Sequence, residues 1–363
     1  MKEKKYIRSL TGKVSRCSVL WGTMLCLFLL PSGCLSDESG NGSDNDLVEI
    51  RLNGGISSST SVSTRGDGMF NGTDTWPDDL AVRFARADKA TDYTAGYLST
   101  PLDAVVNKTA TGDVTKTHVI TFGMALNPSP AYYLANGNKS KLIGWYPSTG
   151  TFDPSAHTVA FPAATLDGST DLMATDLYEG DKNAKITSVA FNHLLTQISV
   201  RVYTESTTTS TVWGTLSSVA IVGMSRSCIV TLPAATAATT GGTEKVTAAF
   251  SGSDNLSLVE KNPSGNSDIS YPVTPGIGAG NSVLAGYAMF APQTDSDNTN
   301  NKITLTVITS AGGTHTAAIP APDGGFKAGS SYVVTLKFGA AEIEPSVSIT
   351  DWQPGTTPGE VEI

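Results

Sequence analysis

Histidine, charged side chains and nucleotide-binding motifs are all scarce in this chain of 363 residues. The four histidines, His118, His157, His193 and His315, stand in no spacing typical of a metal site. Charged residues make up 16% of the chain, the net charge is −9, and no basic cluster follows the N-terminal region. This excludes a nucleic-acid binder. There is no phosphate-binding loop, dinucleotide fingerprint or serine nucleophile motif, so nothing indicates an enzyme or a cofactor.

Cysteine is equally scarce, and its positions exclude a disulfide framework. Cys17 and Cys26 fall in a segment that we expect to be removed on export, and Cys34 is a candidate lipid attachment site. Only Cys228 remains, so an exported form cannot contain an intramolecular disulfide. Burial of apolar side chains must then stabilise the fold. Cys228 stands in an apolar run and is predicted to be a small buried residue rather than a reactive thiol.

Residues 1–33 have the pattern of an export signal. Basic residues precede an apolar core from Ser18 to Leu30, about 13 residues long and too short to span a bilayer. Small residues then lead to Cys34, which predicts cleavage before this cysteine and its lipidation, although Leu30 lies one place too early for the usual pattern. The alternative is an ordinary signal peptide cleaved nearby. No second apolar run approaches membrane-spanning length.

The stretch after Cys34 is acidic and rich in serine and glycine, so it is predicted to be a solvated tether. It resembles the surface-export signal of Bacteroidales lipoproteins, and a generic flexible linker is the alternative. The resemblance implies a lipoprotein of the cell outer membrane that faces the outside of the cell.

Beyond the tether, apolar and polar residues alternate with a period of two, as in half-buried strands. Clear examples are Leu80–Ala85, Gln197–Tyr203 and Tyr332–Phe338. Turn signals such as Asn136-Gly137 separate these runs, and no window of a dozen residues has a helical period. Short strands at regular spacing predict an all-β protein made of sandwiches rather than a parallel sheet.

The division of the chain rests on weaker signals. A polar stretch at 177–183 predicts a boundary, which gives an N-terminal sandwich over 66–183 and a C-terminal sandwich over 184–363. The stretch 204–211 is a rival linker, which we interpret as a hairpin loop between two strongly alternating strands. His118 and His157 lie in alternating runs and are predicted to face solvent on their strands.

Five local patterns follow one another along the chain in a characteristic order. They are the lipoprotein signal, Ile143–Pro147 (IGWYP), Asp171–Ala174 (DLMA) with Phe191–Val200 (FNHLLTQISV), Phe326–Tyr332 (FKAGSSY) and Ile349–Gly355 (ITDWQPG). Together they resemble the fimbrillin family of Bacteroidales type V pili, in particular its Mfa-like members. Taken singly, Trp145 and Trp352 are predicted core aromatics, His193 a residue that bonds backbone, and Gly329 a turn residue with positive φ.

The resemblance implies a fold and a mechanism. Fimbrillins are two tandem transthyretin-like β-sandwiches that travel to the outer membrane as lipoproteins. A trypsin-like protease cuts after an arginine and removes the first strand, and a strand of another subunit fills the groove by β-augmentation. The partners implied are other pilus subunits, an arginine-specific protease, the outer membrane and, for an adhesive subunit, a host or bacterial surface ligand.

The sequence contains matching parts. A cut between Arg65 and Gly66 would release a pro-segment over 34–65. Arg51 is the alternative site, although it lies inside the predicted strand and a cut there would not release the strand whole. The removable strand would be Asp46–Leu52, with apolar Leu47, Val48, Ile50 and Leu52.

At the other end, two segments are candidate donor strands. In Gly359–Ile363, Val361 and Ile363 alternate with glutamates, so that one apolar edge could enter a groove. The other candidate is Pro345–Thr350. The tail could instead complete the subunit's own second sheet, as would suit a tip subunit.

Two further functions stay open at the level of sequence. The chain could be an uncut surface lipoprotein that binds glycan or a host ligand through Trp76, Tyr132 and Tyr133. It could also be a surface glycan-processing enzyme, which would require two carboxylates converging in a cleft.

Overall fold

The computed structural model describes residues 47–56, 79–88, 93, 101–107, 118–124, 127–236, 244–259, 269–294 and 302–350. Strands dominate this part of the chain, and its one α-helix, α1, spans Thr207–Trp213. The prediction of an all-β protein is therefore confirmed. Side chains alternate between buried and exposed along many strands, as the period of two in the sequence requires.

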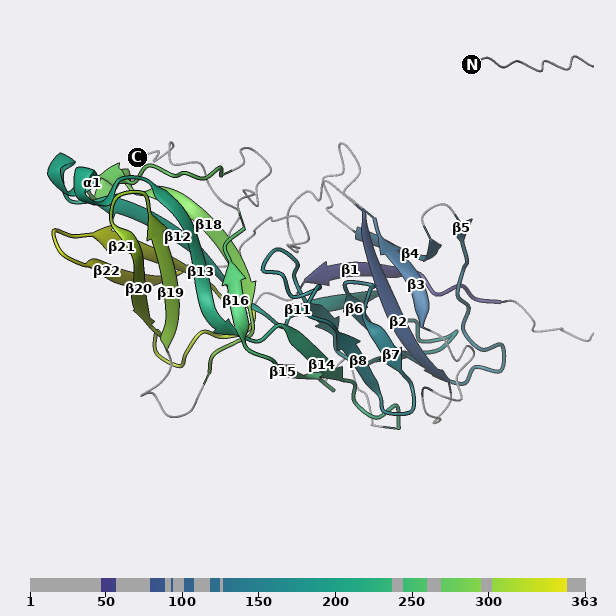
Figure 1. The fold of residues 1–363 in the computed structure, drawn as a ribbon. Helices are drawn as coiled ribbons and strands as arrows, with labels where there is room; N and C mark the ends of the chain where they lie inside the picture. The colour runs from purple at the N-terminus through teal and green to yellow at the C-terminus, as the bar shows by residue number, and fades with distance from the viewer. Residues whose placement is uncertain are drawn as a thin grey trace, which may run out of the picture. The chain divides into compact units, whose positions relative to one another are not determined.

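The largest sheet closes on itself. In order across the sheet its strands are β1 (Leu52–Ile56), β11 (Ser188–His193), β9 (Met173–Thr175), β6 (Ser140–Tyr146), β2 (Leu80–Asp88), β3 (Leu102–Val106), β4 (His118–Met124) and β5 (Asn127–Pro128). Strand β10 (Tyr178–Gly180) pairs with β6. Because β1 pairs with both β11 and β4, the strands from β1 round to β4 form a continuous circuit (Figure 1).

The strands β2 and β6 are buried on both faces. A second sheet contains β7 (Thr151–Asp153), β8 (Thr158–Phe161), β14 (Ser227–Thr231) and β15 (Thr247–Ser251). Phe84 and Leu142 belong to the core enclosed by the circuit, whereas the next residues, Ala85 and Ile143, pack into the core shared with β8 and β14. Burial on two sides explains why β6 reads as a nearly continuous buried run.

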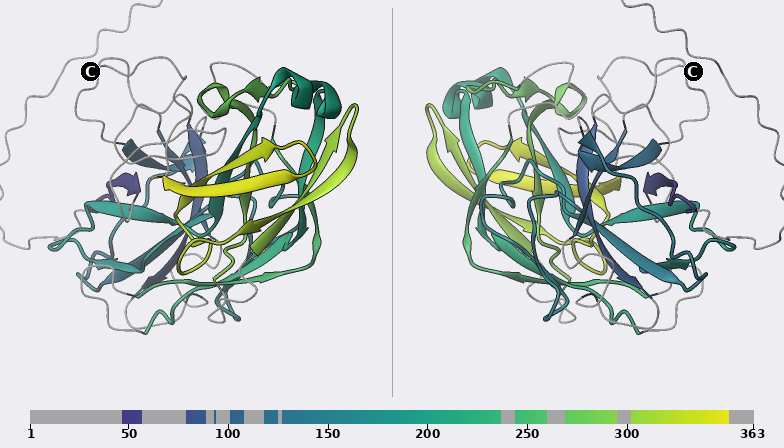
Figure 2. Two further views of the ribbon diagram at one scale, coloured as in Figure 1. Left: turned by 90° about the vertical axis from the view of Figure 1, so that its left-hand side faces the viewer. Right: turned by 90° about the vertical axis from the view of Figure 1, so that its right-hand side faces the viewer.

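The strands after residue 195, apart from β14 and β15, build a separate sandwich. One sheet contains β12 (Thr196–Thr204), β17 (Gly276–Ile277), β18 (Val283–Phe290), β21 (Ser331–Phe338) and β22 (Ile343–Thr350), and the other contains β16 (Asp254–Ser257), β13 (Leu216–Met224), β19 (Lys302–Thr309) and β20 (Gly313–Pro320). Both sheets contribute side chains to one core, among them Ile198, Leu305 and Leu336. Figure 2 shows β22, in yellow, whose one partner among the described strands is β21.

Strand pairing crosses the boundary predicted at residue 183. Strand β11 follows that point in sequence but pairs with β1 and β9, which lie before it. The hairpin β14–β15 likewise leaves the C-terminal sandwich after β13 and pairs with β8. Composition could not show this, because it reports local polarity and not which strands pair.

The prediction of a hairpin loop at 204–211 is wrong. Strands β12 and β13 lie in different sheets, and α1 connects them. The side chain of Ser206 accepts a hydrogen bond from the backbone N–H of Thr209 and caps the helix. Trp213 anchors the end of the helix, because its indole N–H donates to the carbonyl of Gly339 at 2.8 Å.

The prediction that His118 and His157 face solvent on strands is also wrong. His118 is only 1% exposed. His157 lies in the turn before β8 with a φ of 54°, and its ring centroid is 5.3 Å from that of Tyr93. Two other predictions are confirmed, since Trp145 is fully buried and Gly329 has a φ of 67°.

Candidate functional site

The N-terminal segment, Leu47–Ile56, includes most of the stretch predicted as a removable strand, Asp46–Leu52, but the regular strand, β1, begins only at Leu52 and runs on to Ile56. Ile50 and Leu52 are 2% and 1% exposed and belong to the core that the circuit encloses, and Val48 packs against the same core. Leu47 instead is 63% exposed, so it does not belong to the apolar edge that was predicted for it. The period of two places Val48, Ile50 and Leu52 on one face and Leu47 on the other.

The segment is held by two successive sets of backbone hydrogen bonds. The N–H of Ile50 donates to Ala131 O at 2.8 Å, and the N–H of Tyr133 donates to Val48 O at 2.9 Å. Further along, β1 runs antiparallel to β4, with Leu52 opposite Ile120. It also runs parallel to β11 from Asn53 to Ile56. Removal of this segment would therefore break the circuit and leave two strand edges without their partner.

The side chains beneath the segment form an aromatic and aliphatic floor. The Phe84 ring centroid lies 5.7 Å from that of Phe122 and 6.2 Å from that of Phe191, both in edge-to-face geometry. Phe84, from β2, is completely buried. Ile50 and Leu52 belong to the same cluster, so their departure would uncover apolar surface that water would solvate unfavourably.

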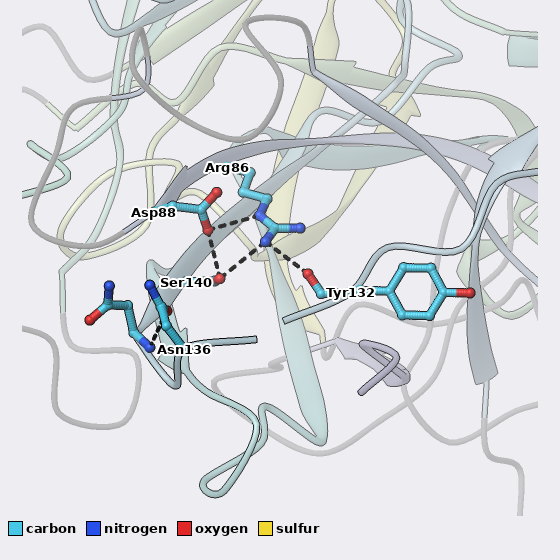
Figure 3. Close-up of polar contacts among 6 residues, drawn as sticks. Arg86, Asp88, Tyr132, Asn136 and Ser140 are labelled. Carbon is cyan, nitrogen blue, oxygen red and sulfur yellow. Dashed lines mark hydrogen bonds and ion pairs between the residues drawn. The ribbon is translucent and has the colours of Figure 1, made fainter. Parts of the chain in front are cut away.

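A buried charged network supports the chain that pairs with this segment. Arg86 Nη2 donates to the Tyr132 carbonyl at 2.8 Å, and Arg86 Nε donates to Asp88 Oδ1 at 3.0 Å. Ser140 Oγ accepts from Arg86 at 3.2 Å and donates to Asp88 at 2.6 Å (Figure 3). The Arg86 and Asp88 side chains are only 1% and 7% exposed. Residues 131–133 are thus held by bonds that do not depend on the N-terminal segment.

Tyr133 holds residues 131–133 in place through a second contact. Its hydroxyl accepts a hydrogen bond from the backbone N–H of Ile186 at 2.7 Å, and burial raises the pKa of this phenol. The side chain is 2% exposed, so the predicted platform with Trp76 and Tyr132 loses one of its three aromatics. Trp76 lies outside the described residues. The ring of Tyr132 points away from the Arg86 network, which reaches only its carbonyl (Figure 3).

A groove of about 560 Å³ lies beside the segment where it changes partners, from 131–133 to β4. It is lined among others by Glu49, Arg51, Thr121 and Pro130. The Arg51 side chain is 83% exposed and pairs with Glu49 at 2.7 Å. The side chain of Arg51 is therefore accessible, but the residues on both sides of it are buried in the core.

The two motifs around Asp171 and His193 meet in the fold. His193 Nδ1 lies 2.6 Å from Asp171 Oδ2, and both side chains are buried. The carboxylate also accepts from the backbone N–H of Leu172 at 2.8 Å. The sequence did not predict this carboxylate partner of His193. The contact ties the residues before β9 to the end of β11, next to β1.

Several predicted site residues lie outside the described part of the chain: Cys34, Arg65, Gly66, Val361, Ile363 and Trp352. The other candidate donor, Pro345–Thr350, lies within β22 and pairs along its whole length with β21. The subunit therefore uses Pro345–Thr350 in its own sheet, whereas the tail, Gly359–Ile363, lies outside the described residues. Its partly buried Ile343 and Val347 pack against the core of the C-terminal sandwich.

The described residues contain no cluster of three or more His, Cys, Asp or Glu side chains arranged to hold a metal ion. Cys228 is a free, buried thiol, and burial raises its pKa from 9.0 to about 12, which confirms its predicted role as a small core residue. No helix in the described part of the chain has the length and apolar content that crossing a membrane requires.

Comparison with known proteins assigns the family. The model of a family described as fimbrillin-like matches residues 87–352. The chain belongs to the fimbrillin-like family. This confirms the resemblance seen in the sequence motifs, most of which lie in the matched range. No curated protein sequence matches the chain.

The chain is similar to several solved structures, and the likeness in fold rests on the first of those that follow. A putative cell adhesion protein from Bacteroides uniformis is 16% identical, with a TM-score of 0.52, over 84% of this chain and 99% of that one. A putative cell adhesion protein from Bacteroides ovatus is 14% identical, with a TM-score of 0.49, over 84% and 98%. The tip fimbrial protein Mfa3 from Porphyromonas gingivalis is 12% identical, with a TM-score of 0.35, over 84% and 100%. Membership in the fimbrillin-like family supports a role as a pilus subunit or adhesin at the cell surface.

Proposed function

We propose that this fimbrillin-like protein is a subunit of a type V pilus that polymerises by exchange of its N-terminal strand. The observation that carries the proposal is the position of the N-terminal segment. It closes the circuit between β4 and β11 and covers the core with Ile50 and Leu52. A strand in this position can be replaced by a strand of another subunit without any change in the order of the others.

Replacement of the N-terminal strand by another strand is energetically more favourable than its loss alone. Full burial of one large aliphatic side chain is worth about 1.5–3 kcal/mol, so loss of Ile50 and Leu52 together is costly. An incoming strand recovers this burial together with the backbone hydrogen bonds along both edges. Arg86 and Tyr133 hold residues 131–133 from the other side, so that this edge keeps its shape for the new strand.

The place of Arg65 in the sequence supports it as the processing site. It lies between β1 and β2, so a cut after Arg65 separates the segment from the body without interrupting any described strand. A cut after Arg51 would leave Leu52 and β1 attached to the body. On this proposal Cys34 carries the lipid that holds the uncut precursor at the outer membrane, and an arginine-specific protease then releases it.

The experiment is N-terminal sequencing of the surface protein combined with SDS gels run without heating. We expect a start at Gly66 and SDS-resistant ladders. Arg65→Ala should abolish both, whereas the matched control Arg51→Ala should leave both unchanged. Protein that is cut at Arg65 and stays monomeric would refute strand exchange. A blocked N-terminus at Cys34, without ladders, would indicate a stable lipoprotein instead.

A further inference from the structure

A side chain at the place of Gly54 in the N-terminal segment would meet the core at close range. A Cβ atom at this position would lie 3.1 Å from Val106 Cγ1 and 3.3 Å from Ile120 Cδ1. Both neighbours are core residues, 0% and 3% exposed, so a side chain at the place of Gly54 would displace packed core atoms. Alanine would therefore be tight here, and a larger side chain would overpack the core.

The strand cannot relieve such a contact by moving outward. Gly54 is opposite His118 on β4 and opposite Val189 on β11. Backbone pairing on both sides fixes its height above the core. Any strand in this place therefore presents inward residues in a set order: large apolar side chains at the places of Ile50 and Leu52, then glycine at the place of Gly54.

We propose, on the basis of the strand exchange above, that Val106 and Ile120 form a size filter that selects the donor strand and its register. The occupant is the segment Gly359–Ile363 of a second copy of this chain. It fits the filter when it runs opposite to β1, with Ile363 and Val361 in the places of Ile50 and Leu52 and Gly359 in the place of Gly54. In the same direction as β1, Gly359 would fall at the place of Val48, away from the filter. In either direction the donor would pair in parallel with one neighbouring strand and antiparallel with the other. The backbone ladders therefore favour neither direction, and the fit of Gly359 against the filter decides it.

Peptide binding to the cut protein tests the filter. The purified chain is cut with an arginine-specific protease, and fluorescence polarisation measures binding of a labelled peptide of residues 47–56. We expect the Gly54→Leu peptide to bind at least about tenfold more weakly, as overpacking of a core predicts. The Arg51→Leu peptide is the matched control, because Arg51 points outward, and it should bind as the parent does. Equal binding of the Gly54→Leu peptide would overturn the filter.

A second peptide pair tests the occupant. A peptide of residues 355–363 should bind the cut protein and compete with the first peptide. Its Gly359→Leu form should lose about tenfold or more in affinity, and its Glu360→Leu form should not. If only the 47–56 peptide binds, or if Gly359→Leu has no effect, the proposed donor or its direction is wrong. If the 47–56 peptide itself fails to bind, strand exchange and the filter both fail.

A variant of the size filter itself completes the test. Val106→Ala removes the methyl group that lies nearest the Gly54 place. For each cut protein, the affinity for the Gly54→Ala peptide is divided by the affinity for the parent peptide. We expect this ratio to be higher for the Val106→Ala protein than for the unaltered protein. An unchanged ratio of the two affinities would refute the assignment of Val106 as part of the filter. Ile120→Val offers a milder change for the same comparison if Val106→Ala folds poorly.

Discussion

Truncation of Leu52 should loosen the N-terminal segment, whereas the same truncation at Leu47 should not. Leu52 is 1% exposed within the core enclosed by the circuit, and Leu47 is 63% exposed. A Leu→Ala change in a core costs about 2–5 kcal/mol, because the transfer free energy is lost and a cavity remains. A change at an exposed site usually stays within about 0.5 kcal/mol. The two leucines thus form a matched pair in the N-terminal segment.

The magnitude can be converted into accessibility. If the cost falls on local release of the segment, about 2 kcal/mol raises the open population roughly 30-fold, since about 1.4 kcal/mol is tenfold. An arginine-specific protease can then cut after Arg51, whose side chain is already exposed. We expect Leu52→Ala to be cut at Arg51 at least about tenfold faster than the parent under native conditions, and Leu47→Ala at the parental rate.

Urea denaturation supplies the control for global stability. Leu336→Ala removes a fully buried leucine from the core of the C-terminal sandwich. It should lower the free energy of unfolding by about 2–5 kcal/mol without a comparable increase in cutting at Arg51. The reasoning is refuted if Leu47→Ala and Leu52→Ala behave alike. It is also refuted if Leu52→Ala lowers global stability but leaves the cutting rate unchanged, because the segment would then not open by itself.

Three further predictions concern buried polar groups. Arg86→Met should lower the free energy of unfolding by about 3–5 kcal/mol in urea denaturation, because it removes the charged partner of the buried Asp88 carboxylate. Arg83→Met breaks a pair that is partly exposed to solvent, and it should cost at most about 1 kcal/mol. His193→Ala should cost about 1–3 kcal/mol, because Asp171 loses its buried partner; an unchanged urea midpoint would contradict this. At pH 8 Cys228 should resist alkylation until urea unfolds the chain, because burial raises its pKa to about 12 and keeps the thiol protonated; rapid modification of the native protein, followed by mass spectrometry, would refute this.

The strands were predictable because burial of one face leaves a local trace. The alternation over Gln197–Tyr203 marks the interior of β12, whose even-numbered residues Ile198, Val200 and Val202 are completely buried. The same holds for Tyr332–Phe338 in β21. A strand packed on one side needs apolar residues at every second position, and the sequence displays this without reference to any partner.

The buried polar groups were not predictable for the opposite reason. His118 occupies a strand position that reads as solvent-exposed, yet it is buried. Tyr133 appears in sequence as a loop aromatic, but its hydroxyl bonds a backbone group that is 53 residues away in sequence. The partner of His193 is a carboxylate 22 residues earlier. A weak signal for that contact was present, since both residues belong to motifs of the family.

By itself, the sequence determined the export signal pattern, the all-β class, the inward face of the N-terminal segment and the resemblance to fimbrillins. All of these depend on residue type and local spacing. Only the tertiary structure decided which strands flank that segment. The pairing of Leu52 with Ile120 and of Gly54 with Val189 joins residues far apart in the chain. Alternation specifies which face of a strand is buried, but not its neighbours, because the backbone groups that form the ladders are the same in every residue. That pairing turns an ordinary amphipathic strand into the one that closes the sheet.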